Sequence, residues 1–174
     1  MDEFYKKAAT TRLVIFDIDG VLTDGSLFLG DDGQQYKAFN SKDGHGLKML
    51  QQSGTQVAII TAKQSNVVKI RMDELGIEHV YQGQSNKLNA LEDIVTQLNI
   101  PLEAIAYVGD DVIDLPVMIR VGLPIAVADA HPFVKRHALW STTKNGGQGA
   151  AREVCEAILQ GQGKLNDILQ HYIL

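Results

Sequence analysis

The stretch R-L-V-I-F-D-I-D-G-V-L-T-D-G, residues 12–25, places two carboxylates directly after four apolar residues. The apolar residues, Leu13 to Phe16, are typical of a strand that is buried on both faces. Asp17 and Asp19 follow with one isoleucine between them. Like charges this close raise each other's pKa and cost stability unless a cation or hydrogen bonds compensate. The stretch therefore predicts a buried strand that ends at a functional site.

The composition predicts one globular domain over residues 1–174. A chain of 174 residues that is 45% apolar can bury one sizeable core but is short for two. The formal net charge is -5 and Lys and Arg are not clustered, which argues against a nucleic-acid partner. No apolar run has the length of a signal peptide or a membrane span, so we expect a cytoplasmic protein with no membrane partner. The single cysteine, Cys155, excludes an internal disulfide, and we expect a buried thiol on a helix.

Short apolar runs alternate with longer amphipathic segments along the chain. The short runs, rich in β-branched residues as buried parallel strands are, cover residues 13–16, 57–60, 104–108 and 124–127. The helical patterns cover residues 46–52, 65–75, 86–98 and 111–121, the first after a turn at Asp43 and Gly44. This alternation predicts an α/β fold with a doubly wound parallel sheet, which binds ligands beyond the carboxyl ends of its strands.

Two segments depart from the alternation. Leu27 to Gly30 and Gln34 to Phe39 flank the turn sequence G-D-D-G, which predicts a β-hairpin that projects after the first strand. Its apolar side chains favour a subunit interface, and a flap packed within its own chain is the alternative. The glycine-rich segment K-N-G-G-Q-G, residues 144–149, is expected to form a flexible rim of the site, followed by two helices that are split near G-Q-G-K.

Polar residues gather at the carboxyl edge of the predicted sheet, at strand ends or helix starts. They are Asp17, Asp19, Thr61, Lys87, Asp110, Asp111 and Asp114. Converging carboxylates would be destabilising alone, whereas a hard divalent cation would neutralise them; Mg²⁺ is the natural occupant, with Mn²⁺ not distinguished. A hydroxyl, an ammonium group and a metal together can hold a phosphoryl group, whose transfer needs positioning and charge neutralisation. The pattern predicts that Asp17 attacks phosphorus and that Asp19 acts as acid and base.

Four motifs, in this order, resemble those of the haloacid dehalogenase superfamily. They are D-I-D-G-V at Asp17, I-I-T at Thr61, N-K-L at Lys87 and G-D-D-V-I-D at Asp110. The resemblance implies that Asp17 is the nucleophile and a Mg²⁺ ligand, that Asp19 is the acid and base with its backbone carbonyl on the metal, and that Asp110 is the third protein ligand. It also implies that Thr61 and Lys87 hold the phosphoryl group.

The resemblance assigns supporting roles to further residues. Asp111 and Asp114 would orient the lysine and a metal-bound water. Arg71, in K-I-R-M-D-E-L-G, would bind a substrate carboxylate with its bidentate fork. Three more residues stay open between structural and functional roles: Asp43 as a helix N-cap or a substrate contact, Asp129 as a capping or an orienting residue, and Arg152 as a contact to phosphate or substrate.

Further stretches resemble the members of this superfamily that act on sugar-acid phosphates. They are V-L-T-D-G, K-D-G-x-G, Y-Q-G-Q-S-N-K-L, A-Y-V-G-D-D, A-V-A-D-A-H-P and G-G-x-G-A-x-R-E-V. The resemblance implies 3-deoxy-D-manno-octulosonate 8-phosphate as substrate, in lipopolysaccharide biosynthesis, with a nine-carbon sugar-acid 9-phosphate as the alternative. Relatives usually have Gly-Arg where this chain has Ala62-Lys63, and the retained base at Lys63 favours the eight-carbon acid.

The segments after the first motif and between Thr61 and Lys87 are too short to encode a cap domain. The resemblance implies a homotetramer instead, in which a neighbouring subunit completes the site. The motifs also bear on two other functions. A phospho-accepting receiver module would place its paired acids after the first strand but its acceptor Asp on a middle strand, and a noncatalytic oligomerisation domain would have lost the nucleophile or the lysine. Neither fits this order of motifs.

Overall fold

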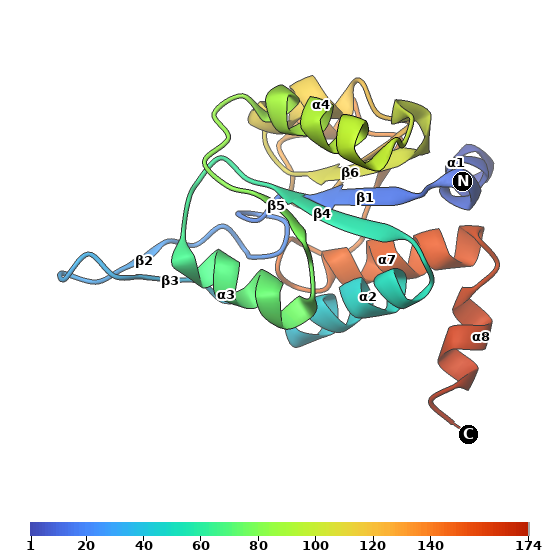
Figure 1. Ribbon diagram of the computed structural model, residues 1–174, viewed down its shortest axis with the longest axis horizontal. Coiled ribbons are helices and arrows are strands. Elements are labelled where there is room, and N and C mark those ends of the chain that lie inside the picture. Colours follow the sequence, from blue (N-terminus) through green and yellow to red (C-terminus); the bar gives the residue numbers. More distant parts are fainter. Residues whose placement is uncertain (174) are drawn as a thin grey trace.

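The computed structural model describes residues 1–173, and a six-stranded sheet lies at its centre (Figure 1). The strands are β1 (Leu13–Phe16), β4 (Gln56–Ile60), β5 (His79–Tyr81), β6 (Ile105–Gly109), β7 (Leu123–Ala126) and β8 (Trp140–Ser141). Their order is β5-β4-β1-β6-β7-β8, and every neighbouring pair is parallel. The chain runs outward in one direction through β4 and β5, and in the other through β6, β7 and β8. The prediction of a doubly wound α/β sheet is confirmed, and its switch point lies between β1 and β6.

Helices cover both faces of the sheet. Figure 1 shows α4 (Lys87–Leu98) above the sheet, with α2 (Ser41–Gln52), α3 (Asn66–Leu75) and α7 (Ala150–Gly161) below it. The N-terminal α1 (Asp2–Thr10), which the sequence analysis did not predict, packs against α7 and buries Phe4 and Ala8. The short helices are α5 (Leu115–Met118), which packs against α4, α6 (Pro132–Lys135) and α8 (Leu165–Gln170). Cys155 is a buried free thiol on α7, as expected.

Two predicted helices differ from the observed ones. The helix expected at Gly46 begins at Ser41, because the Asn40 side chain accepts a hydrogen bond from Lys42 N (2.8 Å) and caps it there. The helix expected over residues 111–121 is divided into a 3₁₀ turn (Val112–Asp114) and α5. Pro116 has no N–H to continue an α-helix from Val112, which explains the break.

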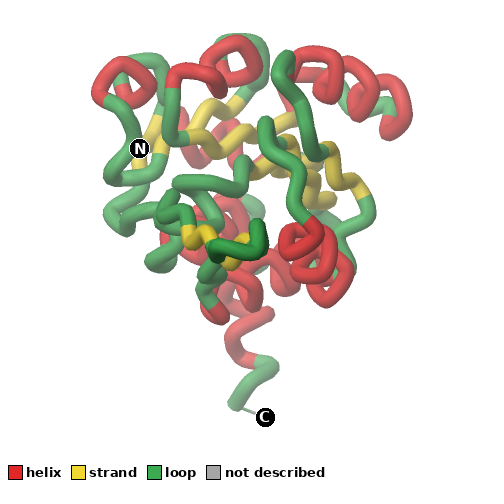
Figure 2. Tube along the Cα trace, turned by 90° about the vertical axis from the view of Figure 1, so that its left-hand side faces the viewer, coloured by secondary structure: helices red, strands yellow, loops and turns green. Residues whose placement is uncertain are grey.

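The predicted hairpin is present and projects from the body of the protein. Its strands are β2 (Phe28–Leu29) and β3 (Gln35–Tyr36), drawn at the far left of Figure 1 and pointing toward the viewer in Figure 2. Its large apolar side chains are more than half exposed: Leu27, Phe28, Leu29 and Tyr36. The described chain therefore does not pack these side chains within itself.

No helix within residues 1–173 has the length and apolarity that crossing a membrane requires.

Candidate active site

The register of the central strands brings the predicted residues to one edge of the sheet. Phe16 is level with Ile59 of β4 and with Val108 of β6. Asp17, the next residue, is therefore level with the end of β4 and of β6, and Thr61 and Asp110 each lie one residue further along. Strand β1 is completely buried, so Asp17 emerges from the core with only 4% of its surface exposed.

Lys87 is the cation at the centre of this edge. It is the first residue of α4, which is capped by the Asn86 side chain, and its own side chain is 2% exposed. Its Nζ lies 3.1 Å from Asp17 Oδ1 and 2.6 Å from Asp114 Oδ1. Burial alone would lower the pKa of Lys87, but the charges of Asp17 and Asp114 outweigh it and raise that pKa. The lysine is therefore held as an ammonium ion between two carboxylates.

Asp114 is fully occupied by hydrogen bonds. Its Oδ1 accepts from Lys87 and from the Tyr107 hydroxyl (2.6 Å), and its Oδ2 accepts from the backbone N–H groups of Asp110 (3.0 Å) and Asp111 (3.2 Å). These bonds fix both the lysine and the turn that carries Asp110. Asp114 therefore links Lys87 to the turn that carries Asp110, and its role in orienting the lysine stays a prediction.

Tyr107 was missed by the sequence analysis, which placed it in the strand core. It lies on β6 with no exposed surface, donates to Asp114 and accepts from Lys87 Nζ (3.1 Å). The sequence could have indicated a role for Tyr107, because a buried tyrosine needs a partner for its hydroxyl and this one interrupts an otherwise apolar strand.

Asp110 has a buried oxygen that lacks a hydrogen bond. Its Oδ1 is one of two buried side-chain polar atoms without a partner in residues 1–173. Burial, followed by the charges of Asp114 and Asp17, raises the pKa of Asp110 to about 8. Burial and the charge of Asp114 likewise raise the pKa of Asp17 to about 6, although Lys87 opposes this. The cluster of Asp17, Asp110 and Asp114 thus holds more negative charge than Lys87 can balance.

This excess charge fits a divalent cation. Oxygens of Asp17, Asp110 and Asp114 all lie within 4.8 Å of one another. Asp17 Oδ1 is taken by Ile18 N (2.7 Å) and Lys87, and both Asp114 oxygens are taken. Asp17 Oδ2 and the carboxylate of Asp110 are left as ligands, and hard carboxylate oxygens are what Mg²⁺ prefers.

Asp19 lies at the mouth of this edge, beyond the carboxylate cluster. Its side chain is 20% exposed, and its Oδ1 forms an ion pair with Lys37, which follows the hairpin strand β3. The loop that carries it turns at Gly20 (φ 90°), where a Cβ would lie 2.1 Å from Asp110 Oδ2. Only glycine allows the Asp19 loop and Asp110 to approach this closely.

Thr61 and Lys63 follow β4, at the same edge. Thr61 is 2% exposed, and its backbone is held by Tyr81 O (2.9 Å) and Gln84 N (3.1 Å). Lys63 is exposed, and its carbonyl accepts from Gly83 N (3.1 Å). The side chain of Lys63 has no hydrogen bond or ion pair to the described residues.

Arg71 is separate from the carboxylate cluster in its contacts. It lies on α3, pairs with Glu74 (3.2 Å) and borders a small cavity with Asn40 and Asp43 of α2. A Cβ at Gly44 would lie 2.3 Å from its guanidinium, and its Nε is the second buried polar atom without a partner. Its guanidinium is thus only partly satisfied within residues 1–173.

Asp111 and Asp43 both act as helix caps. Asp111 Oδ1 accepts from Val112 N (2.7 Å), and its exposed side chain has no contact with Lys87. Asp43 lies inside α2 and accepts from Gly149 N (3.3 Å) and Arg152 N (2.8 Å), so it caps α7 rather than its own helix. Burial raises the pKa of Asp43.

The glycine-rich segment is held tightly against the Asp19 loop. Gly147 N donates to Val21 O (2.9 Å), and Gly146 N donates to Asp129 Oδ1 (2.9 Å). A Cβ at Gly146 would lie 1.7 Å from Gly20 O. The guanidinium of Arg152 contacts Glu156 of α7 (2.6 Å) and His45 of α2 (3.2 Å). The segment of residues 144–149 therefore packs closely against the Asp19 loop and supports it, whereas we expected a flexible rim of the site.

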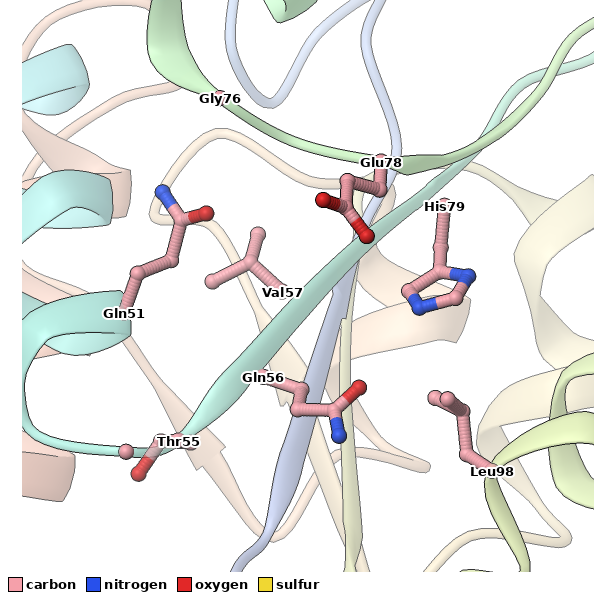
Figure 3. Close-up of a pocket in the computed structure, with 9 residues that line it drawn as sticks. Gln51, Thr55, Gln56, Val57, Gly76, Glu78, His79 and Leu98 are labelled. Carbon is pink, nitrogen blue, oxygen red and sulfur yellow. The ribbon is translucent and has the colours of Figure 1, made fainter.

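A groove lies at the opposite edge of the sheet, at the amino ends of β4 and β5. It encloses about 460 Å³ and is lined by Gln51, Thr55, Gln56, Glu78 and His79, among others (Figure 3). Figure 3 shows one carboxylate and one imidazole among amides and apolar side chains. This set lacks the clustered carboxylates and the lysine of the other edge, so we place the candidate site at the carboxyl ends.

Residues 76–154 match the haloacid dehalogenase-like hydrolase family. The 3-deoxy-D-manno-octulosonate 8-phosphate phosphatase of Escherichia coli K12 is 51% identical over 161 residues, which cover 92% of this chain and 86% of that protein. The corresponding Yersinia pestis phosphatase structure is 47% identical, with a TM-score of 0.94 over 95% of this chain and 89% of that one. The Moraxella catarrhalis phosphatase, solved in complex with magnesium ion, phosphate ion and KDO, is 41% identical, with a TM-score of 0.97 over 99% of both chains. From the shared fold and these identities over most of its length, we conclude that the chain belongs to the 3-deoxy-D-manno-octulosonate 8-phosphate phosphatase family of haloacid dehalogenase-like hydrolases.

Proposed function

We propose that this protein is a Mg²⁺-dependent phosphatase that converts 3-deoxy-D-manno-octulosonate 8-phosphate to the free sugar acid and phosphate, in lipopolysaccharide biosynthesis. The observation that carries the proposal is the buried carboxylate cluster around Lys87, with the partnerless Asp110 Oδ1 beside it, in a chain of this family. A site with a fixed ammonium and room for a divalent cation suits phosphoryl transfer, which depends on positioning and charge neutralisation.

Asp17 is the proposed nucleophile. Ile18 N and Lys87 both contact its Oδ1 and so fix the orientation of this carboxylate at the sheet edge. Attack forms the aspartyl–phosphate bond and breaks the bond from phosphorus to the ester oxygen, while Asp19 gives that oxygen a proton. Asp19 then takes a proton from the water that attacks the phosphoryl group, and Asp17 and phosphate are released.

Asp17, the Asp19 backbone carbonyl and Asp110 are the proposed metal ligands. Bound Mg²⁺ would neutralise the carboxylates and the phosphoryl oxygens. Lys87 and Thr61 would hold the phosphoryl group, and Asp114 keeps Lys87 in place. The hydrogen bonds of Asp114 support a positioning role, whereas Asp111 has contacts only within its own turn.

Arg71 and Lys63 are the proposed contacts to the sugar acid. The partnerless Nε of Arg71 supports a carboxylate ligand, because a buried donor without a partner is costly. Lys63 is exposed at the site's edge and keeps a positive charge where relatives usually have arginine. The positive charge of Lys63 favours the eight-carbon acid, and the nine-carbon acid phosphate stays the alternative substrate, because lysine lacks the bidentate fork of arginine.

We further propose a cytoplasmic homotetramer in which the hairpin contributes to the interface. The four exposed apolar side chains of the hairpin support this, since such patches commonly mark contact sites. In sedimentation velocity, the double substitution Phe28→Glu and Leu29→Glu should give smaller species. The control Ile119→Glu, at a residue 61% exposed elsewhere, should not. An unchanged tetramer in the double variant would show that the hairpin is not part of the interface.

The enzymatic test is phosphate release from the eight-carbon ester, beside the nine-carbon ester and an aryl phosphate, with Mg²⁺ or with EDTA. We expect Mg²⁺-dependent turnover with preference for the eight-carbon ester. Asp17→Asn should abolish turnover and keep the fold, whereas Asp167→Asn, at an exposed position on α8, should behave like the parent. Preference for another ester would change the substrate, and no release from any ester would refute the phosphatase proposal.

A further inference from the structure

Lys37 has a buried side chain and no role in the chemistry proposed above. It directly follows the hairpin strand β3, and its side chain is only 3% exposed. Its Nζ pairs with Asp19 Oδ1, and the hydrogen bonds and ion pairs of residues 1–173 contain no other partner for it. The neighbouring hairpin residues Gln35 and Tyr36 are exposed, whereas the side chain of Lys37 is buried against the body of the protein.

The burial of the Lys37 side chain makes its ion pair with Asp19 energetically more important than an ion pair on the surface. Lysine is almost never buried unless it is paired, because removing an ammonium group from water is costly. The chain offers a comparison in Lys69 and Asp73 on α3, which pair at 2.5 Å with side chains 66% and 62% exposed. Such exposed pairs contribute little. The ammonium group of Lys37 is thus shielded from solvent and paired with Asp19.

The pair leaves one Asp19 oxygen available. Lys37 occupies Oδ1, and Oδ2 accepts no hydrogen bond from the described residues. The Asp19 side chain is 20% exposed, so this carboxylate is not sealed from solvent. An aspartate fixed at one oxygen presents the other in a defined direction, which is what a proton-transfer group needs.

We propose that Lys37 is a positioning residue for Asp19, which holds Oδ1 so that Oδ2 is presented to the leaving-group oxygen and then to the attacking water. The inference rests on the proposed phosphatase function. It also gives the base of the hairpin a role inside its own subunit, because the hairpin carries Lys37 to the Asp19 loop.

The test compares two esters with different leaving groups. A sugar alkoxide needs a proton as it leaves, whereas p-nitrophenolate leaves without one. Single-turnover rates of sugar release and of nitrophenolate release are measured with Mg²⁺ and enzyme in excess, for the parent, Lys37→Met, Lys37→Arg and the control Lys69→Met. Thermal melts show that each variant is folded, and a crystal structure of Lys37→Met reports the orientation of the Asp19 side chain.

In Lys37→Met we expect sugar release to fall by about 10- to 100-fold, part of the typical effect of general acid catalysis. Nitrophenolate release should change by less than about threefold, substrate affinity should be unchanged, and Asp19 should adopt a new rotamer while Asp17 does not. Lys37→Arg should restore most of the sugar-release rate, because it keeps a cation for Oδ1, and Lys69→Met should match the parent.

Three results would overturn the inference: an unchanged rate of sugar release in Lys37→Met, an equal loss for both esters, or a loss of affinity alone. The second would indicate a purely structural role, and the third a contact to substrate. A parent protein that releases neither leaving group would instead refute the phosphatase function, so the two failures are distinguishable.

Discussion

Asp110→Asn should stabilise the metal-free protein at neutral pH and remove its response to Mg²⁺. The Asp110 carboxylate has a buried oxygen without a partner and lies beside Asp17 and Asp114. Burial and these two charges raise its pKa from 3.8 to about 8. Because the folded protein binds the proton more tightly than the unfolded chain, the stability is fully present below pH 3.8 and is lost as the pH rises toward 8.

The slope of this loss is about 1.4 kcal/mol per pH unit between the two pKa values. From pH 5 to pH 7 it amounts to at most about 2.7 kcal/mol, and to about 2 kcal/mol with solvent screening of the half-buried group. For a chain of this size, that corresponds to about 4–8 °C in melting temperature. The asparagine variant lacks this loss, because its side chain does not ionise.

The assay is thermal melting of the parent, Asp110→Asn and the exposed-site control Asp167→Asn, at several pH values in EDTA and in Mg²⁺. In EDTA, the melting temperature of the parent should fall relative to Asp110→Asn by about 4–8 °C between pH 5 and pH 7. Mg²⁺ should stabilise the parent more at pH 7 than at pH 5 and leave Asp110→Asn unchanged. A parent and a variant whose melting temperatures run parallel with pH would refute the reasoning.

Three further substitutions test the packing of the site. Tyr107→Phe removes the hydroxyl that bonds to Asp114 and Lys87, so urea unfolding should show a loss of about 1–3 kcal/mol, and an unchanged value would contradict the buried network. Lys87→Met leaves two buried carboxylates without their cation and should lower the free energy of unfolding by about 3–5 kcal/mol at pH 7 and by less at pH 5. An equal loss at both pH values would indicate that these carboxylates are not charged. Gly146→Ala places a Cβ 1.7 Å from Gly20 O and should cost about 1–3 kcal/mol and lower turnover; a parent-like variant would show that the loop can yield.

Most of the framework could be predicted from residue patterns. Continuous apolar runs identified the central strands, and that at residues 13–16 matches β1 residue for residue. Alternation with helical segments implied parallel strands, and parallel strands place the residues after each strand at one edge. Asp17, Thr61 and Asp110 could therefore be grouped before any coordinates. Single-domain organisation and the roles of the site residues stay predictions.

Helix limits and hydrogen-bond partners were predicted less well. The start of α2 depended on the Asn40 cap, and the break before α5 on Pro116, both local features that the periodicity of apolar residues does not register. Asp43 was expected to cap its own helix or bind substrate, yet its carboxylate accepts from Arg152 N, 109 residues away. That partner depends on how α2 and α7 pack together.

The sequence by itself determined the alternation of the central strands and helices and the chemical groups at the sheet edge, because periodicity and motif spacing are local properties of the chain. Only the tertiary structure decided which oxygens are used and which stay free. Lys37 reaches Asp19 across 18 residues, and Lys87 reaches Tyr107 and Asp114 across 20 and 27. Each pairing depends on the position of a whole hairpin or helix, which is set by packing of the entire core.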